Sequence, residues 1–375
     1  MKKIVFITGT RADFGKLESL INKLELESKF EVYIFITGMH LQRKYGYTYA
    51  EIESKNYSNL YTFINYNKEN SMDVTLANTI SGFSKYINTV VTPDLIVVHG
   101  DRLESLACAI VGSFNNILVA HVEGGELSGT IDESIRHSIS KLSHIHFVTS
   151  NSAKKRLIQL GENSNNIYVI GSPDIDLMIS KNLPSLEESI ERYQLPFKEY
   201  SLILYHSVTS EIEELSFYME QLIKAVVDSN ENYIVIYPNN DSGSDLIINS
   251  FKKYFNKNPK IKIFPSLRFE HFLTLLKNSK FILGNSSAGI SEAPFYGIPT
   301  INIGSRQNNR SSNKEIINVS HNYKSILTAI YKAKNMKIKK NSDFGSGGSA
   351  KKFLKVLKSN KTWNVKIQKY FNDIN

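Results

Sequence analysis

The sequence predicts an α/β protein with two doubly wound domains, each built on a parallel sheet. Short runs rich in β-branched residues alternate with stretches long enough to form helices, and this alternation occurs twice along the 375 residues. Several runs are apolar throughout, which is typical of parallel strands covered by helices on both faces. A hydrophobic share of 41% over this length is enough for two cores.

The elements follow from these runs in chain order. The first alternation predicts strands at residues 3–8, 32–37, 95–99, 118–122 and 144–148. The second predicts strands at 201–205, 233–237, 261–264, 281–283 and 300–303. Helix-length segments between them include 72–90, 211–229 and 269–277. The linker-like stretch 181–185 places the domain boundary within about 172–185, and the last predicted element is an amphipathic helix over 362–371.

The bulk features exclude several classes of protein. No apolar run reaches the roughly 18–20 residues of a membrane-spanning helix. The apolar run near the N-terminus is short and has no cleavage site after it, so we interpret it as a first strand and not as a signal peptide. The single cysteine, Cys108, excludes an internal disulfide and is expected to be a small buried apolar residue. A cytoplasmic protein fits these features.

The net charge of +9 is a local feature of the C-terminal part. Residues 332–369 contain twelve lysines, one acid and no arginine, a net charge of +11, so the rest of the chain sums to −2. A nucleic-acid-binding face would interleave arginines and aromatic residues with the lysines. These lysines are instead scattered along amphipathic segments, which favours a solvated surface with mild attraction for anionic substrates.

The first predicted strand is followed by Gly9-Thr10-Arg11-Ala12-Asp13-Phe14-Gly15-Lys16. This is a tight turn into a helix, and a helix N-terminus beside Arg11 can bind an anion. The segment lacks both the glycine spacing of a dinucleotide-binding fingerprint and the Gly-Lys-Ser/Thr of a P-loop. A phosphate site and an ordinary strand–helix turn both remain compatible with it.

Three carboxylates follow two other predicted strands of the first domain. Asp101 comes after residues 95–99, Glu123 follows 118–122, and Asp132 lies shortly downstream at a helix start. In an open α/β sheet the carboxyl ends of the strands form the ligand-binding edge. Crowded carboxylates raise one another's pKa and become candidate general acids and bases. The alternative for Asp132 is a helix N-cap. The nearby histidines at 137, 144 and 146 lack the spacing of metal ligands and are expected to be structural.

In the second half, a predicted strand leads into Gly284-Asn285-Ser286-Ser287 and then into a helix carrying Glu292 a turn or two later. Hydroxyls and free N–H groups at a helix start can hold a diphosphate, and a carboxylate nearby can accept hydrogen bonds from ribose. A capped helix with a surface glutamate is the alternative.

The motifs together resemble the hydrolysing UDP-N-acetylglucosamine 2-epimerases, and most closely the enzymes of bacterial sialic-acid capsule synthesis. The resemblance covers essentially the whole chain, in order. Its motifs are Gly9-Thr10-Arg11-Ala12-Asp13, Thr37-Gly38-Met39-His40, Gly100-Asp101-Arg102, His121-Val122-Glu123-Gly124-Gly125-Glu126, Ile131-Asp132-Glu133-Ser134-Ile135-Arg136-His137, Gly284-Asn285-Ser286-Ser287 and Gly304-Ser305-Arg306-Gln307.

The resemblance implies a GT-B-like fold of two Rossmann-type domains facing a central cleft. Residues 1–175 would form the catalytic domain, completed by a C-terminal helix over 360–375, and residues 176–359 would bind UDP. It also implies the reaction: UDP-N-acetylglucosamine and water give N-acetylmannosamine and UDP through a 2-acetamidoglucal intermediate, as the first step of sialic acid biosynthesis. No metal or other cofactor is implied. The partner is the UDP-sugar, with no nucleic acid and no membrane insertion, and a homodimer or a tetramer is expected.

The family's functional residues carry over position by position. Asp101, Glu123 and Asp132 would be the acid–base carboxylates, held in place by Arg136. The implied substrate contacts are Arg11, His40, Arg102, His206, Asn239, Ser286, Ser287, Glu292 and Arg306. The motif at His206 departs from the family pattern, because Ser207 stands where a proline would follow His206, and the segment that begins at Asn308 is also looser than that pattern.

Four other functions share parts of this pattern. The same chemistry on a diacetamido-trideoxyhexose nucleotide of the legionaminic acid pathway would use the same motifs. A non-hydrolysing epimerase would have proline and glutamate where Ala12 and Asp13 follow Arg11. A GT-B glycosyltransferase commonly needs one base rather than three carboxylates, and a non-catalytic sugar-nucleotide sensor would lack one of them.

Overall fold

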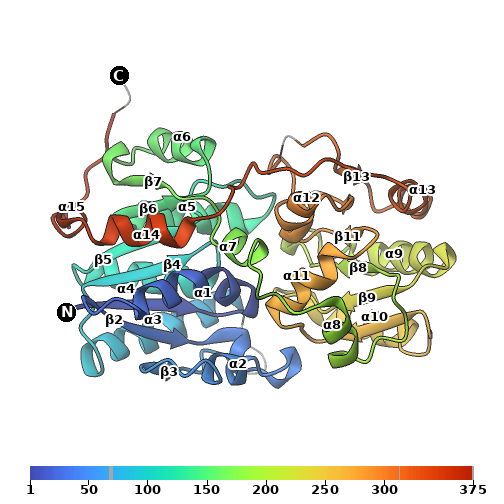
Figure 1. The fold of residues 1–375 in the computed structure, drawn as a ribbon, viewed down its shortest axis with the longest axis horizontal. Helices are drawn as coiled ribbons and strands as arrows, with labels where there is room; N and C mark the ends of the chain where they lie inside the picture. Colours follow the sequence, from blue (N-terminus) through green and yellow to red (C-terminus); the bar gives the residue numbers. More distant parts are fainter. Residues whose placement is uncertain (67–70, 312, 374–375) are drawn as a thin grey trace. The chain divides into compact units, whose positions relative to one another are not determined.

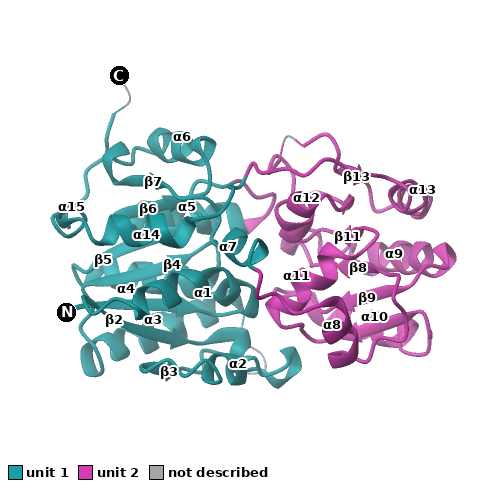
Figure 2. Ribbon diagram, viewed as in Figure 1, with its two compact units in different colours: residues 1–126, 132–180, 344–375 teal, residues 127–131, 181–343 magenta. Residues whose placement is uncertain are grey.

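The chain forms two compact α/β units, and the computed structural model describes residues 1–66, 71–311 and 313–373 (Figure 1). Unit 1 comprises Met1–Glu126, Asp132–Ser180 and Phe344–Asn375, and unit 2 comprises Leu127–Ile131 and Lys181–Asp343 (Figure 2). The bounds expected from the sequence lay at 175/176 and 359/360. The assignment of catalysis to the first unit and UDP binding to the second stays a prediction.

Within the described residues, unit 1 contains a seven-stranded parallel sheet in the order β3-β2-β1-β4-β5-β6-β7. Its strands are β1 (Lys2–Thr8), β2 (Phe30–Ile36), β3 (Leu60–Thr62), β4 (Leu95–His99), β5 (Leu118–Val122), β6 (Ile145–Val148) and β7 (Ile167–Val169). Its helices are α1 (Arg11–Glu25), α2 (Tyr49–Glu53), α3 (Met72–Thr89), α4 (Leu103–Phe114), α5 (Ile131–Leu142), α6 (Asn151–Gln159), α7 (Asp174–Met178), α14 (Ser349–Leu357) and α15 (Asn360–Trp363).

Helices cover both faces of this sheet, as the uniformly apolar strands predict. Successive residues of a strand point to opposite faces. Accordingly, Ile4 and Phe6 of β1 pack with α1 and α14, whereas Val5 and Ile7 pack with α3, α4 and α5 (Figure 1). Cys108 of α4 is buried in the second of these cores, as expected, and burial raises the pKa of its thiol well above the usual value.

Unit 2 contains a six-stranded parallel sheet, again counted over the described residues, in the order β10-β9-β8-β11-β12-β13. Its strands are β8 (Ser201–Leu204), β9 (Tyr233–Ile236), β10 (Ile261–Phe264), β11 (Ile282–Gly284), β12 (Thr300–Ile303) and β13 (Ile317–Val319). Its helices are α8 (Leu186–Arg192), α9 (Leu215–Ser229), α10 (Ser244–Phe255), α11 (Phe269–Lys277), α12 (Glu292–Tyr296) and α13 (Tyr323–Ala333). One core joins α9, α10 and α13 to the sheet.

The predicted strands are confirmed, four of them with the predicted bounds and six within two residues. Three strands were missed, namely β3, β7 and β13, each of three residues at a sheet edge. The helix predicted over 362–371 is wrong, because helical structure ends at Trp363. The next residues alternate between exposed and half-buried side chains, with Val365 and Ile367 against the core of unit 1, and this period of two belongs to an extended segment.

Candidate active site

The candidate residues of unit 1 lie at the carboxyl edge of its sheet. Strands β1, β4 and β5 are parallel neighbours, so the turns that follow them meet at one edge. These turns carry Arg11, Asp101 and Glu123, and α5 follows β5 with Asp132 and Arg136. The sheet therefore brings the three predicted carboxylates to the same edge.

Glu123 is the most deeply embedded of these carboxylates. It is buried, and its backbone adopts a left-handed φ of 62°, a conformation that costs a non-glycine residue of order 1–3 kcal/mol and is concentrated at functional sites. The residue is held there by a hydrogen bond from its N–H to the carbonyl of Phe147, at 2.8 Å. The strained turn aims the side chain at a polar cluster.

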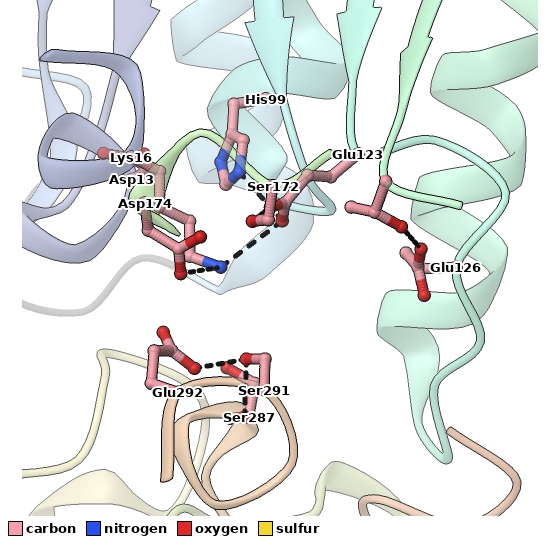
Figure 3. Close-up of polar contacts among 12 residues, drawn as sticks. Asp13, Lys16, His99, Glu123, Glu126, Ser172, Asp174, Ser287, Ser291 and Glu292 are labelled. Carbon is pink, nitrogen blue, oxygen red and sulfur yellow. Dashed lines mark hydrogen bonds and ion pairs between the residues drawn. The ribbon is translucent and has the colours of Figure 1, made fainter. Parts of the chain in front are cut away.

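Three side chains bind the Glu123 carboxylate (Figure 3). Oε2 lies 3.1 Å from His99 Nε2 and 3.4 Å from Lys16 Nζ, and Oε1 accepts a hydrogen bond from the Ser172 hydroxyl. Burial alone would raise the pKa of Glu123, but the charges of Lys16 and His99 and the hydrogen bonds from His99 and Ser172 outweigh it and hold the pKa well below its usual range. The site therefore contains a desolvated carboxylate that is ionised at neutral pH.

Lys16 connects this carboxylate to a second one. Its ammonium lies 3.4 Å from Glu123 and 3.4 Å from Asp174, the first residue of α7 (Figure 3). All three side chains are almost fully buried, so the lysine balances two negative charges that water does not screen.

Arg136 links the turn that follows β4 to the turn that follows β5. Its Nη1 donates to the backbone carbonyl of Glu123 at 2.9 Å, and its Nη2 pairs with the carboxylate of Asp101. Burial would lower the pKa of Arg136, yet it is raised by Asp101 first, and then by Glu126, Glu123 and Asp132. The structure thus brings Asp101, Glu123 and Arg136 into contact, with half-buried Asp132 close enough to act on the arginine through its charge.

The two candidate arginines at the starts of α1 and α4 already have protein partners. Arg11 pairs with Glu51, and Arg102 Nε lies 3.8 Å from the Glu104 carboxylate. The N-terminus of α1 is occupied by Asp13, whose carboxylate accepts hydrogen bonds from the N–H groups of Gly9 and Thr10 at 3.0 and 3.1 Å. An anion at this helix start would have to share these groups with Asp13.

His40 lies in the interior rather than at an open edge. Its ring is buried, with Nε2 2.9 Å from Thr8 Oγ1 and Nδ1 2.6 Å from Thr48 Oγ1. Burial, and then the charge of Arg11, lower its pKa to about 3, so the ring is neutral at physiological pH.

In unit 2, His206 and Asn239 meet at the ends of β8 and β9. The Asn239 N–H donates to His206 Nδ1 at 3.1 Å. Asn285, just after β11, joins this pair to the rest of the edge: its amide accepts from the His206 N–H at 2.7 Å and donates to the His206 carbonyl at 2.8 Å. The Asn285 carbonyl in turn accepts from Gln307 at 2.8 Å and from Arg306 at 3.3 Å.

The serine-rich turn is shorter than the sequence suggested. Ser286 caps a single 3-10 turn over Ser287–Gly289, and not a long helix. Glu292 is the first residue of the five-residue helix α12, not one or two turns inside a helix as expected, and it is buried with the Ser291 hydroxyl bound to its carboxylate (Figure 3). The early break follows from Gly289 and Pro294, since glycine and proline interrupt helices.

Five residues of these clusters were not singled out as site residues from the sequence. They are Lys16, His99, Ser172 and Asp174 around Glu123, and Asn285 at the centre of the unit 2 edge. Lys16 and His99 had a usable signal, because a lysine one turn into a buried helix and a histidine closing an apolar strand are unusual unless they are paired. Ser172 and Asp174 lie far along the chain and gave none.

Two features are absent from the residues that the structure describes. No helix of these parts of the chain combines the length and apolar character that crossing a membrane requires. Residues 1–66, 71–311 and 313–373 also contain no group of three or more His, Cys, Asp or Glu side chains arranged to hold a metal ion.

Comparison with known proteins places the chain in a family. The family model described as UDP-N-acetylglucosamine 2-epimerase matches residues 22–358. The chain belongs to this family. It is 47% identical to the UDP-N-acetylglucosamine 2-epimerase of Neisseria meningitidis serogroup B, with 100% of both chains covered. It is 36% identical to the hydrolysing UDP-N,N'-diacetylbacillosamine 2-epimerase of Legionella pneumophila, with 96% of each chain covered.

Solved structures agree on the fold. The UDP-GlcNAc 2-epimerase of Methanocaldococcus jannaschii, in complex with UDP-GlcNAc and UDP, aligns with a TM-score of 0.80 at 23% identity. The alignment covers 95% of this chain and 99% of that one. The fold class predicted from the sequence, a GT-B-like pair of doubly wound α/β domains, is therefore confirmed.

Proposed function

We propose that this family member is a hydrolysing UDP-N-acetylglucosamine 2-epimerase, which converts UDP-N-acetylglucosamine and water into N-acetylmannosamine and UDP. Full-length identity of 47% to the Neisseria epimerase supports the substrate. The observation that carries the proposal is the group of carboxylates at the edge of unit 1, in which Glu123 is ionised and buried while Asp101 is held by Arg136.

The first half of the reaction removes a proton and a leaving group. A carboxylate takes the proton from C2 of the sugar, the C1–O bond breaks, and the electron pair leaves with UDP. The product is a 2-acetamidoglucal with a C1–C2 double bond. C2–H is weakly acidic, so the base must be fixed in place and desolvated.

The second half adds water. The oxygen of water bonds to C1, and C2 receives a proton on the face opposite to the one that lost it. Hydrolysis therefore gives free N-acetylmannosamine with inverted C2.

We assign the roles by the contacts of each carboxylate. Glu123 is buried against Lys16 and His99, which favour its ionised form, and a carboxylate held in one charge state is a poor proton carrier. Glu123 is better suited to stabilise the positive charge that develops at C1 as UDP leaves. Asp101 and Asp132 then take and return the protons, with Arg136 fixing Asp101.

Unit 2 would hold the nucleotide. His206, Asn239, Ser286, Ser287 and Arg306 offer ring nitrogens, hydroxyls, N–H groups and one guanidinium to a diphosphate, and Glu292 offers a carboxylate to the ribose hydroxyls. The remaining predicted substrate contacts are Arg11 and Arg102 to the diphosphate and His40 to the sugar.

We also propose a cytoplasmic homodimer that acts in the first step of sialic acid synthesis and needs no cofactor. Light scattering coupled to size exclusion tests the dimer, since a mass near 42.6 kDa would contradict it. The second candidate substrate is UDP-N,N'-diacetylbacillosamine, because the chain is 36% identical to an epimerase of that name.

A proton NMR time course in deuterated water tests the function. With UDP-N-acetylglucosamine, the proposal expects N-acetylmannosamine with one deuterium at C2, together with free UDP. Accumulation of UDP-N-acetylmannosamine would show a non-hydrolysing epimerase. Turnover of the diacetylated nucleotide alone would establish the second candidate, and no turnover of either would overturn the proposal.

A further inference from the structure

Helix α5 carries Arg136 and Asp132, so its position determines the geometry of the site. A helix is stiff, and a shift at one end moves every side chain along it. Arg136 bridges Asp101 and the carbonyl of Glu123, which requires its guanidinium to lie in register with two separate turns.

The C-terminus of α5 is bound by a residue more than two hundred positions away. Lys369 directs its ammonium at three carbonyls there, those of Ser140, Lys141 and Ser143, at 3.3, 2.7 and 2.5 Å. The last carbonyls of a helix lack partners within it, and a positive charge there is favourable. Lys369 thus supplies both the donors and the charge that this helix end lacks.

Buried Glu162 holds Lys369 in place. Its carboxylate lies 2.7 Å from Lys369, 3.0 Å from Lys141 and 3.1 Å from His146. Burial would raise the pKa of Glu162, but the His146 hydrogen bond and charge and the Lys369 ammonium lower it to about 2. Glu162 is therefore ionised at neutral pH, opposite the Lys369 ammonium, whose pKa burial lowers from its usual value although the charge of Glu162 opposes this.

The segment that carries Lys369 is fixed on both sides. Val365 and Ile367 pack on the core of unit 1, and His144 Nε2 donates to the Ile367 carbonyl at 3.0 Å. Beyond Lys369, the Asn372 side chain donates to the Gly161 carbonyl at 3.1 Å. Lys369 is accordingly a rigid anchor and not a mobile surface lysine.

A second connection runs from the same end of α5 to Asp101. His121 is buried, with Nδ1 3.0 Å from Ser140 Oγ and Nε2 2.8 Å from the carbonyl of Gly100. Gly100 immediately precedes Asp101. Displacing the C-terminal end of α5 would therefore disturb both members of the Asp101–Arg136 pair.

We propose that Lys369 is a positioning residue of the active site, which fixes helix α5 so that Arg136 stays in register with Asp101 and Glu123. The effect on turnover rests on the proposed function. Lys369 touches neither substrate nor reacting atoms in this scheme, and it acts through the helix.

The test compares Lys369→Met with Lys369→Arg and with Lys366→Met, an exposed lysine of the same segment that loses the same charge. A displacement of about 1 Å can lower a rate by about a hundredfold, so for a partial release of α5 we expect kcat to fall roughly tenfold in Lys369→Met. KM should change less than twofold, because unit 2 is untouched. Lys369→Arg should recover kcat to within about threefold of wild type, and Lys366→Met should match wild type.

Hydrogen–deuterium exchange without substrate provides the second readout. Peptides covering 131–142 should exchange faster in Lys369→Met than in Lys366→Met, and this comparison is valid even if no sugar nucleotide is turned over. If Lys369→Met does not fold, Lys369→Gln keeps a donor while removing the charge. Unchanged kcat or unchanged exchange over 131–142 in the folded variant would overturn the inference, whereas absence of wild-type turnover would overturn only the proposed function.

Discussion

The candidate residues of unit 1 and those of unit 2 are built from different chemistry. In unit 1, buried ions of both signs compensate one another, with Lys16 between Glu123 and Asp174 and Arg136 on Asp101. In unit 2, the contacts are mainly between neutral groups: the amide of Asn285 with the backbone of His206, and the Ser286 hydroxyl with the N–H of Ala288.

The difference corresponds to two different tasks. Fixed and desolvated charges create a strong local field, which is what stabilises charge that appears only in a transition state. Neutral donors bind an anion without a large desolvation cost and release it again, which suits a leaving diphosphate. We therefore expect substitutions in unit 1 to lower kcat and substitutions in unit 2 to raise KM.

The largest effect is expected from Glu123→Gln. The change keeps the shape of the side chain but removes the ionised group, so kcat should fall on the order of 10³-fold while KM changes little. Release of UDP in a coupled assay measures both constants. Glu231→Gln is the control, because Glu231 also binds two lysines, Lys280 at 3.3 Å and Lys334 at 3.2 Å, outside the candidate site. A rise in KM with unchanged kcat in Glu123→Gln would contradict the division between the units.

Asn285→Ala is the corresponding change in unit 2. It removes both amide hydrogen bonds that join the ends of β8 and β11, each worth about 1 kcal/mol, so KM should rise roughly tenfold or more with a smaller change in kcat. Asn302→Ala, at a buried asparagine of β12 that binds Asn318 at 2.8 Å, controls for general loss of stability. The division fails if the two asparagine variants have the same KM.

How far the sequence predicted the fold depended on the length of each element. Ten strands were found because each lies in a short run dominated by apolar and β-branched residues, which is a local signal. Strands β3, β7 and β13 were missed because three residues at a sheet edge give no such run. In 364–371, Val365 and Ile367 alternate with polar residues, which is the period of two of an extended segment. The predicted helix assumed a period of 3.6 residues there.

The site was partly predictable for a related reason. Parallel strands deliver their carboxyl ends to one edge, so Asp101 and Glu123 could be brought together from the sequence alone. The roles given to them and to the other candidate residues stay predictions. Ser172, which binds Glu123, and Asp174, which binds Lys16, lie about fifty residues from Glu123 in the sequence, and only tertiary packing brings them there. The sequence did not predict the partners of His40 and Arg11 for the same reason.

Gly129→Ala tests the expected division between the units, in which substitutions in unit 1 lower kcat and substitutions in unit 2 raise KM. The segment Leu127–Ile131 belongs to unit 2, although the residues on either side of it belong to unit 1 (Figure 2). The Gly129 N–H donates to the Arg306 carbonyl at 2.9 Å, and a Cβ at Gly129 would lie 2.2 Å from the Ser305 carbonyl oxygen. Asp132 follows shortly after, so this variant should change kcat and KM together.

The lost hydrogen bond sets a lower bound on this effect, because the added Cβ also forces the backbone to shift. Loss of the hydrogen bond is worth about 1 kcal/mol, which corresponds to about a fivefold change. Steady-state kinetics of Gly129→Ala beside Asn308→Ala, an exposed residue of the same loop as Arg306, provides the measurement. A change confined to KM would show that the segment serves unit 2 alone.

The smallest expected effect distinguishes stability from catalysis within unit 1. The His40 ring is neutral in the folded protein, with a pKa of about 3 against about 6.5 in the unfolded chain. Between these two pH values the unfolded state binds a proton on this ring and the folded state does not. The stability involved is fully present above pH 6.5 and is lost as the pH falls toward 3, at about 1.4 kcal/mol per pH unit. Between pH 7.5 and 5.5 only the part below about 6.5 contributes, so urea unfolding should show a loss of stability over this interval that is smaller by about 1.4 kcal/mol in total in His40→Gln. His137→Gln should keep the contribution of His40. Equal losses of stability in wild type and His40→Gln would contradict the buried neutral ring.

An increase in KM of His40→Gln at pH 7.5, where the ring is neutral in both states, would instead support the predicted sugar contact.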